Sequence, residues 1–347
     1  MTNIVKIVNE DFTKHLSIDF TVSNVCNYSC HYCHPGSNEG TRQSPKDFDL
    51  LIKNFDHLLN TYKNNFNKTE IKIEITGGEP TVWPRLQDFA KYIKENHQLQ
   101  NVALTTNASR TMRWWEENGK YFDEVHISLH DECDVNHIIN VADFLYNETD
   151  NHVAVNVIMD PTNWDKCKVN LDKVVNHNTR WLVKTWVLTK DGHIRTDYTN
   201  EQLEMFRDKV HKMPPQEYID KMLARKIIPP KSTAKFIYDD GSIEPYNSFM
   251  LRSTNEHNFY GWQCNLGVDR IPIIFGDLVG SCGARNIFNL EEPLSLYDED
   301  FTSRFTTDII SPIICNQYSC GSCTKDLKIP KHSIGGYSKI IPIINEK

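Results

Sequence analysis

The sequence lacks the features that mark membrane, secreted and nucleic-acid-binding proteins. No apolar run approaches the roughly 20 residues of a transmembrane helix, and the first residues, Met-Thr-Asn-Ile-Val-Lys, show no charged-then-apolar signal pattern. Basic residues are not in excess, because 38 Lys and Arg stand against 46 Asp and Glu, for a net charge of −8. Internal repeats and low-complexity tracts are also missing. We therefore expect a cytoplasmic globular protein with no membrane and no nucleic acid among its partners.

Ten cysteines are present, and without a secretory signal we expect reduced thiols rather than disulfides. The most informative are Cys26, Cys30 and Cys33, which form Cys-x3-Cys-x2-Cys in one short segment. Three thiolates are one ligand too few for the irons of a [4Fe–4S] cube, so one iron would keep an open position where chemistry can occur. The alternative is a zinc site with His31 or His34 as the fourth ligand, although zinc motifs usually pair cysteines as Cys-x2-Cys.

Strand-like and helix-like segments alternate through residues 1–213. Six such units predict an α/β fold, because parallel strands joined by helical crossovers form a partial (β/α)6, TIM-like barrel. In barrels of this type the active site lies at the carboxyl ends of the strands. The predicted strands are 16–22, 71–76, 102–105, 124–129, 153–159 and 181–188, and the predicted helices are 46–62, 84–97, 111–118, 135–146, 164–175 and 201–211.

Polar and glycine-rich segments follow the predicted strands and should therefore meet at one rim. The cysteine segment follows the first strand, and Gly77-Gly78-Glu79-Pro80 follows the second. Glycines let the backbone approach a ligand closely, and freed carbonyls can accept hydrogen bonds from an ammonium group. The other candidates at strand ends are Asn107, Ser128, His130, His193 and Arg195.

A second, smaller α+β domain is predicted for residues 231–347, after a proline-bracketed linker at 214–230. A hairpin is expected at 271–279, broken by Gly276-Asp277. The domain has four cysteines at spacings that could hold one metal site, either an iron–sulfur cluster or a structural zinc ion: Cys264, Cys282, Cys320 and Cys323. Cys315 would be a free thiol or a replacement for one of these four.

The cysteine motif, with Tyr32 just before its third cysteine, resembles the signature of radical SAM enzymes. The resemblance implies the same partial barrel, a [4Fe–4S] cluster, and S-adenosyl-L-methionine (SAM) chelated by the open iron. It also implies one-electron cleavage of SAM to a 5′-deoxyadenosyl radical. The positions that it implies for SAM binding are Tyr32, Gly77, Gly78, Glu79, Asn107 and Ser128. From its place after the sixth strand, Arg195 could bind the SAM carboxylate as a bidentate fork, and His130 and His193 are candidate catalytic residues. One departure is Ala108, where the family usually has glycine.

The C-terminal cysteines resemble those of the twitch domain, the shorter relative of the SPASM domain, which implies one auxiliary [4Fe–4S] cluster. The expected function is hydrogen abstraction from a small polar metabolite, with oxidation or rearrangement as the outcome. A peptide-modifying maturase is the alternative, but only about fifteen residues precede the first predicted strand, too few for a leader-binding domain. A second alternative is a non-enzymatic iron–sulfur or zinc-binding protein. An enzyme of this kind needs a reductant such as flavodoxin or ferredoxin.

Overall fold

The computed structural model describes residues 4–8, 14–33, 36, 38–40, 47–97, 99, 101–178, 180–190, 193–206, 210–225, 227, 235–245, 263–278, 288 and 292–314. At residues 4–8, 190, 193 and 263 the description covers the backbone alone.

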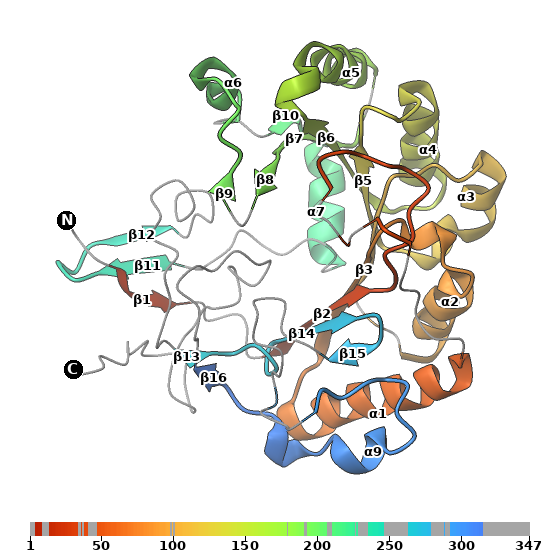
Figure 1. The fold of residues 1–347 in the computed structure, drawn as a ribbon, viewed down its shortest axis with the longest axis vertical. Helices are drawn as coiled ribbons and strands as arrows, with labels where there is room; N and C mark the ends of the chain where they lie inside the picture. Colours follow the sequence, from red (N-terminus) through yellow and green to blue (C-terminus); the bar gives the residue numbers. More distant parts are fainter. Residues whose placement is uncertain are drawn as a thin grey trace.

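The centre of the molecule is a nine-stranded sheet in the order β10-β7-β6-β5-β4-β3-β2-β14-β15. All neighbours from β14 to β7 are parallel, whereas β10 and β15 are antiparallel edge strands. The sheet curves as an open arc whose two edges do not meet (Figure 1), which confirms the predicted partial barrel. Its strands are β2 (His15–Thr21), β3 (Glu70–Thr76), β4 (Asn101–Thr106), β5 (Glu124–Leu129), β6 (His152–Met159), β7 (Leu182–Val187), β10 (Val210–Lys212), β14 (Arg270–Ile274) and β15 (Asp277–Leu278).

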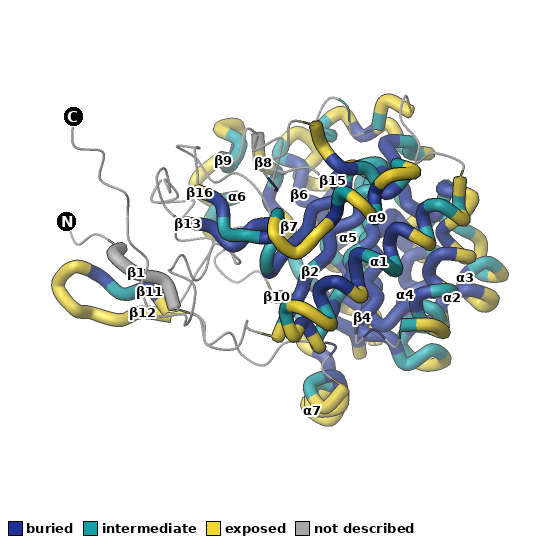
Figure 2. Tube along the Cα trace, turned by 90° about the horizontal axis from the view of Figure 1, so that it is seen from below, coloured by how far each residue is buried: buried dark blue, intermediate teal, exposed yellow. Residues whose placement is uncertain are grey.

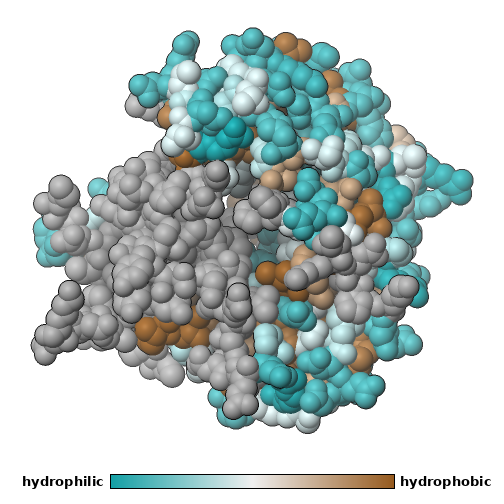
Figure 3. Space-filling view, viewed as in Figure 1, coloured by the Kyte–Doolittle hydropathy of each residue, from teal (hydrophilic) through white to brown (hydrophobic). Residues whose placement is uncertain are grey.

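The outer face of the sheet is covered by helices that follow the strands in turn (Figure 1). Alternate strand residues such as Ile73, Ile127 and Val155 are fully buried there, which accounts for the dark layer between sheet and helices in Figure 2. The helices are α1 (Phe48–Phe66), α2 (Leu86–His97), α3 (Met112–Asn118), α4 (Val135–Glu148) and α5 (Trp164–Asn176). Their outward sides are largely hydrophilic at the right-hand edge of Figure 3. Among the described residues, no helix combines the length and apolar character needed to cross a lipid bilayer.

Helix starts follow local signals in the sequence. Asp47, Thr111 and Asp134 cap α1, α3 and α4, because each side chain accepts a hydrogen bond from a backbone N–H of the first turn. Three short 3-10 segments lie between these elements. η2 (Pro80–Val82) follows β3, η3 (Gly119–Tyr121) follows α3, and η4 (Pro161–Asn163) follows β6. Local capping therefore fixes where the crossover helices begin.

The predicted helix at 201–211 is wrong over most of its length. Helix α6 spans only Asn200–Glu204, and Val210–Lys212 instead form β10. The apolar spacing of Leu203, Phe206 and Val210 imitates a helical face. However, β10 pairs with β7, which supplies backbone hydrogen-bond partners that a sequence pattern cannot reveal.

The predicted hairpin at 271–279 is present as β14 and β15, but it belongs to the barrel sheet, because β14 lies parallel to β2. Helix α9 (Phe301–Arg304) contacts α1. The buried apolar residues described between Cys264 and Ile313 thus share one hydrophobic core with the barrel. The linker predicted at 214–230 contains α7 (Gln216–Ala224). An auxiliary-cluster domain at 231–347 stays a prediction.

Three small sheets complete the described structure. Strand β1 (Ile4–Val8), which the sequence did not predict, pairs with β11 (Lys235–Tyr238), and β11 pairs with β12 (Ile243–Pro245). Strands β8 (Thr189–Lys190) and β9 (His193–Ile194) form a short ribbon after β7. Strand β13 (Gln263–Cys264) pairs with β16 (Ile313–Ile314), which follows η5 (Thr307–Ile309).

Candidate active site

The cysteine segment lies at the carboxyl end of β2, held against the loop that follows β3. The Val22 N–H donates to Thr76 O at 2.9 Å, the Gly78 N–H to Ser23 O at 2.8 Å, and the Glu79 N–H to Val25 O at 2.8 Å. These bonds extend the β2–β3 pairing past the end of the sheet. The predicted rim is therefore formed by two loops that hydrogen-bond directly.

The three motif cysteines are free thiols in one loop, with Cys30 buried and Cys26 and Cys33 half-buried. The hydrogen bond that the Cys30 thiol donates to Cys33 raises the pKa of Cys30 and lowers that of Cys33. A [4Fe–4S] cube places each thiolate on a different iron. Three cysteine thiols in one short loop therefore match the ligand set of a [4Fe–4S] cluster with one open iron.

Gly77 and Gly78 are required by the close approach of the two loops. Gly77 has φ +145°, and a Cβ there would collide with Ser23 O. A Cβ on Gly78 would collide with Val25 O. Any side chain at either position would push the cysteine loop away from β3, so the glycine pair is a steric condition for this rim.

Glu79 is buried, and its carboxylate is fully engaged with protein groups. Oε1 accepts from the Thr106 hydroxyl at 2.7 Å and from the Thr81 N–H at 3.0 Å, while Oε2 accepts from the Asn107 N–H at 2.7 Å. The side chain therefore ties the loop after β3 to the end of β4. Asn107 continues the link, because its amide donates to Asn27 Oδ1 in the cysteine loop at 3.0 Å.

Ala108, where the resembling family usually has glycine, adopts φ +54° and is fully buried. This left-handed conformation costs a residue with a Cβ roughly 1 kcal/mol relative to glycine. The backbone of this chain therefore keeps the conformation that glycine favours.

Tyr32 and His130 bring the cysteine loop against the end of β5. Their rings stack with centroids 5.9 Å apart, and a hydrogen bond of 2.8 Å joins the Tyr32 hydroxyl and His130 Nδ1. Ser128 lies two residues before His130 on the inner face and is half-buried. Cys133 is half-buried near this contact, and its Sγ accepts a hydrogen bond from the His130 N–H at 3.3 Å.

Arg195 lies near the end of β6 with its guanidinium already bound. Nε donates to Asp197 Oδ1 at 3.0 Å, a second nitrogen pairs with the other carboxylate oxygen, and this contact raises the pKa of Arg195. The fork expected to bind a SAM carboxylate is thus occupied by Asp197. Arg195 also approaches Asp160 at 3.8 Å, and Asp160 in turn contacts His31 Nε2 at 3.1 Å. The backbone of His193 lies in β9.

The sequence that forms the rim is similar to a known protein family. Residues 20–143 match the sequence profile described as "Radical SAM superfamily". This range contains the cysteine loop, the Gly-Gly-Glu turn and the ends of β4 and β5. The chain contains a radical SAM domain. Domains of this family work with SAM and a [4Fe–4S] cluster.

Curated relatives that match the radical SAM domain include two GTP 3′,8-cyclases. The one from Pasteurella multocida is 29% identical over 114 residues, which cover 30% of this chain and 31% of the relative. The one from Cronobacter sakazakii is 26% identical over 204 residues, covering 56% and 59%. The chain therefore spans less than two thirds of the length of these relatives.

Two solved structures are also similar. SuiB from Streptococcus suis bound to precursor peptide SuiA shares 14% identity at a TM-score of 0.48, covering 85% of this chain and 65% of that one. BtrN in complex with AdoMet and 2-DOIA shares 14% identity at a TM-score of 0.34, covering 59% and 89%.

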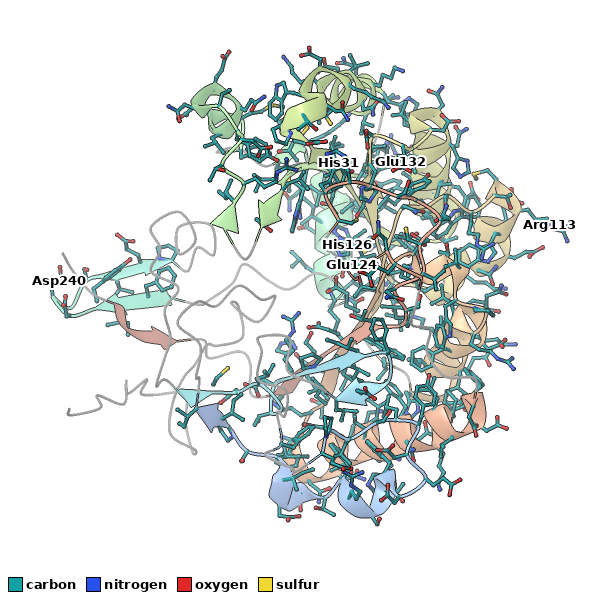
Figure 4. The ribbon with its side chains drawn as sticks, in the orientation of Figure 1. His31, Arg113, Glu124, His126, Glu132 and Asp240 are labelled. Carbon is teal, nitrogen blue, oxygen red and sulfur yellow. The ribbon has the colours of Figure 1, made fainter. Side chains whose placement is uncertain are left out.

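Below the rim, the inner face of the radical SAM barrel carries a charged network centred on Glu124. Its carboxylate accepts from Lys72 Nζ at 2.8 Å, contacts His126 Nε2 at 2.8 Å, and accepts from the Asn101 amide at 3.0 Å. Burial alone would raise the pKa of Glu124, but His126 and Lys72 outweigh it and lower the pKa well below its ordinary value. Glu124 and His126 lie next to each other in Figure 4, with His31 and Glu132 nearer the rim.

Several side chains of the rim were not identified from sequence. Asn27 bridges to Asn107 and to the Ser109 hydroxyl, at 2.9 Å, and Glu132 Oε2 accepts from the Ser29 N–H at 3.3 Å. Asp160 directly follows β6 and could have been found by the rule that located Ser128 and Asn107, that polar residues at strand ends meet at the rim. Asn27 and Glu132 carried no comparable signal.

The predicted auxiliary site falls largely outside the described residues. Cys264 is buried in β13 and belongs to the core shared with the barrel. Cys282, Cys315, Cys320 and Cys323 lie beyond the part of the chain that the structure describes. His34, the zinc alternative in the first loop, lies there as well.

Proposed function

We propose that this protein is a radical SAM enzyme that abstracts hydrogen from a small polar metabolite, leading to oxidation or rearrangement. One observation carries the proposal: three free thiols and the polar ends of β3, β4 and β5 meet at one rim, above an inner face lined with charged groups. A structural metal site would require the loop but not the polar inner face.

Cys26, Cys30 and Cys33 would hold the cluster, with SAM on its open iron. When bound, this pair supplies one-electron cleavage of SAM and a radical able to take hydrogen from carbon. The chain itself fixes the loop: Gly77 and Gly78 allow its close approach, and Glu79 and Asn107 hold it against β4. The stacked Tyr32 and His130 then fix the same loop against the end of β5.

The small-molecule substrate is supported by the GTP 3′,8-cyclase relatives, whose name gives a nucleotide as the substrate. The similarity covers 31% to 59% of those relatives, so a nucleotide-like metabolite is proposed as a class and no particular compound is assigned. The metabolite would lie on the inner face, below the rim, because the active sites of such barrels lie at the carboxyl ends of the strands.

Two further parts of the proposal concern electrons. An auxiliary [4Fe–4S] cluster on Cys264, Cys282, Cys320 and Cys323 would accept an electron in an oxidation or help to hold the substrate. A cytoplasmic flavodoxin or ferredoxin would reduce the first cluster. The alternatives are a peptide-modifying maturase and a non-enzymatic iron–sulfur or zinc-binding protein.

The test is SAM cleavage under anaerobic conditions. The reconstituted protein, given SAM and dithionite, should form 5′-deoxyadenosine, and Cys30→Ala should form none. Cys167→Ala is the matched control, because Cys167 is a similarly buried thiol on α5 that lies outside the cysteine motif. If the wild-type protein holds an intact cluster by spectroscopy and still forms no 5′-deoxyadenosine, the enzyme proposal fails and the non-enzymatic alternative stands.

A further inference from the structure

Three side chains lie in a group on the inner face of β6 and β7: Asn156, Lys184 and Trp186. The strand register places Asn156 beside Lys184 and Ile158 beside Trp186. Val155, Val157, Val183 and Val187, which alternate with them along the strands, belong to the core beneath the helices. Because successive side chains of a strand point to opposite faces, the three project inward.

This group differs from the network one layer below. There, Glu124 already has Lys72, His126 and the Asn101 amide as partners. The ion pairs of Glu124 among the described residues are with Lys72 and His126, and none is with Lys184. The lower layer is thus a hydrogen-bonded protein network, and Asn156 and Lys184 are not part of it.

Within the described part of the chain, neither the Asn156 amide nor the Lys184 ammonium has a hydrogen-bond or ion-pair partner. Both residues are only half-exposed, and the indole of Trp186 is 54% exposed. Burial lowers the pKa of the Lys184 ammonium, and the attraction of the Glu124 carboxylate opposes this only in part, so a bound anion would stabilise the charged form. Trp186 lies two residues beyond Lys184 on the same strand, about 6–7 Å away. Its exposed indole offers a planar surface. Charge and shape therefore both favour an external anionic ligand.

We propose that Asn156, Lys184 and Trp186 form a substrate subsite for a small molecule that carries an anionic oxygen group, phosphate or carboxylate, beside a planar ring. The inference rests on the proposed function, since it places the metabolite below the cysteine loop. Lys184 and Asn156 donate hydrogen bonds to the anion, and the ring stacks on Trp186. Ser128 and the rim loops lie on the neighbouring strands and remain available for SAM.

Binding of matched probe pairs to the reconstituted protein with SAM present tests this assignment. Guanosine 5′-monophosphate against guanosine probes phosphate, and orotate against uracil probes a ring carboxylate, each measured by calorimetric titration. We expect the anionic member of at least one pair to bind about 10-fold tighter, as one charge-assisted contact provides. Lys184→Met should remove that preference and Lys184→Arg should keep it. Lys168→Met, at an exposed lysine on α5, is the control and should change nothing.

The outcomes separate cleanly. Equal affinity of the wild-type protein for both members of both pairs overturns the subsite, as does an anion preference that survives in a folded Lys184→Met variant. If Lys184→Met weakens SAM binding about 10-fold, Lys184 belongs to the SAM site and the assignment is also wrong. Formation of 5′-deoxyadenosine is scored separately, so an anion preference without SAM cleavage would support the subsite and reject the proposed enzyme.

Discussion

At the residue scale, Glu79 of the Gly-Gly-Glu turn binds other groups of the protein. Its carboxylate accepts hydrogen bonds from Thr81, Thr106 and Asn107 and is almost completely buried. A bare carboxylate without these donors would be strongly unfavourable in this position. The motif glutamate therefore holds two loops at a fixed separation, and the SAM-binding role expected from sequence stays a prediction.

Glu79→Gln should destabilise the protein by about 1–3 kcal/mol, because the amide nitrogen cannot accept from the Asn107 N–H and leaves a buried donor unpaired. Urea unfolding followed by circular dichroism measures the change. Glu116→Gln, at an exposed position of α3, is the control and should shift the midpoint little. A Glu79→Gln midpoint equal to that of the control would show that these bonds contribute nothing net.

The buried His152 should make the stability of the folded protein depend on pH. Burial lowers its pKa from 6.5 to about 4, so the folded state keeps the imidazole neutral while the unfolded chain takes up a proton below pH 6.5. Stability is therefore complete above pH 6.5 and declines as the pH falls toward 4, by about 3 kcal/mol in total. His152→Gln should flatten the stability curve over this window in urea titrations at several pH values. An unchanged slope would mean that other groups cause the acid sensitivity.

At the element scale, the attachment of β14 to β2 decides how far the barrel closes. Arg270 on β14 and Asp19 on β2 form a buried ion pair through Arg270 Nε. Lys68 and Asp269, at the starts of β3 and β14, form a second one at 2.6 Å. Both pairs join a late segment of the chain to early strands, so the C-terminal hairpin is part of the barrel wall.

Asp19→Ala should destabilise the protein by about 3–5 kcal/mol, because it removes the carboxylate that is paired with the buried Arg270 guanidinium. The double variant Asp19→Ala/Arg270→Met should recover much of that loss, since both charges of the buried pair are then removed. Thermal and urea unfolding of both variants provide the comparison. A double variant as unstable as the single one would assign the effect to packing rather than to charge.

At the scale of the whole molecule, the proposed auxiliary cluster can be separated from the SAM-binding one. The two together predict about eight irons per chain after reconstitution, and one alone about four. Cys320→Ala should lower the iron content to about four and keep SAM cleavage to 5′-deoxyadenosine, while formation of the metabolite product stops. Iron analysis and chromatography of the products measure these changes. If Cys30→Ala and Cys320→Ala behave identically, the two sites do not have separate roles.

The parts of the molecule differ in how far their structure could be predicted from the sequence. The six barrel strands lie within two residues of their predicted bounds, because each is a run of alternating or continuous apolar residues ended by a turn. The rim positions of Gly77, Asn107 and Ser128 follow from the same rule. In contrast, the strand β10, the addition of β14 to the barrel and the bonds of Asn27 depend on partners more than 25 residues away along the chain.

The sequence by itself determined the cysteine loop, the order of strands and helices and the rim at which the motifs meet, because spacing and periodicity are local properties of the chain. Only the tertiary structure decided that Arg195 is bound to Asp197, that Glu79 joins β3 to β4, and that Lys184 and Asn156 form no hydrogen bond or close ion pair with any described residue. Those outcomes depend on strand register and on which side chains reach one another across the sheet. Long-range contacts of this kind have no local pattern, so they are fixed only when the chain folds.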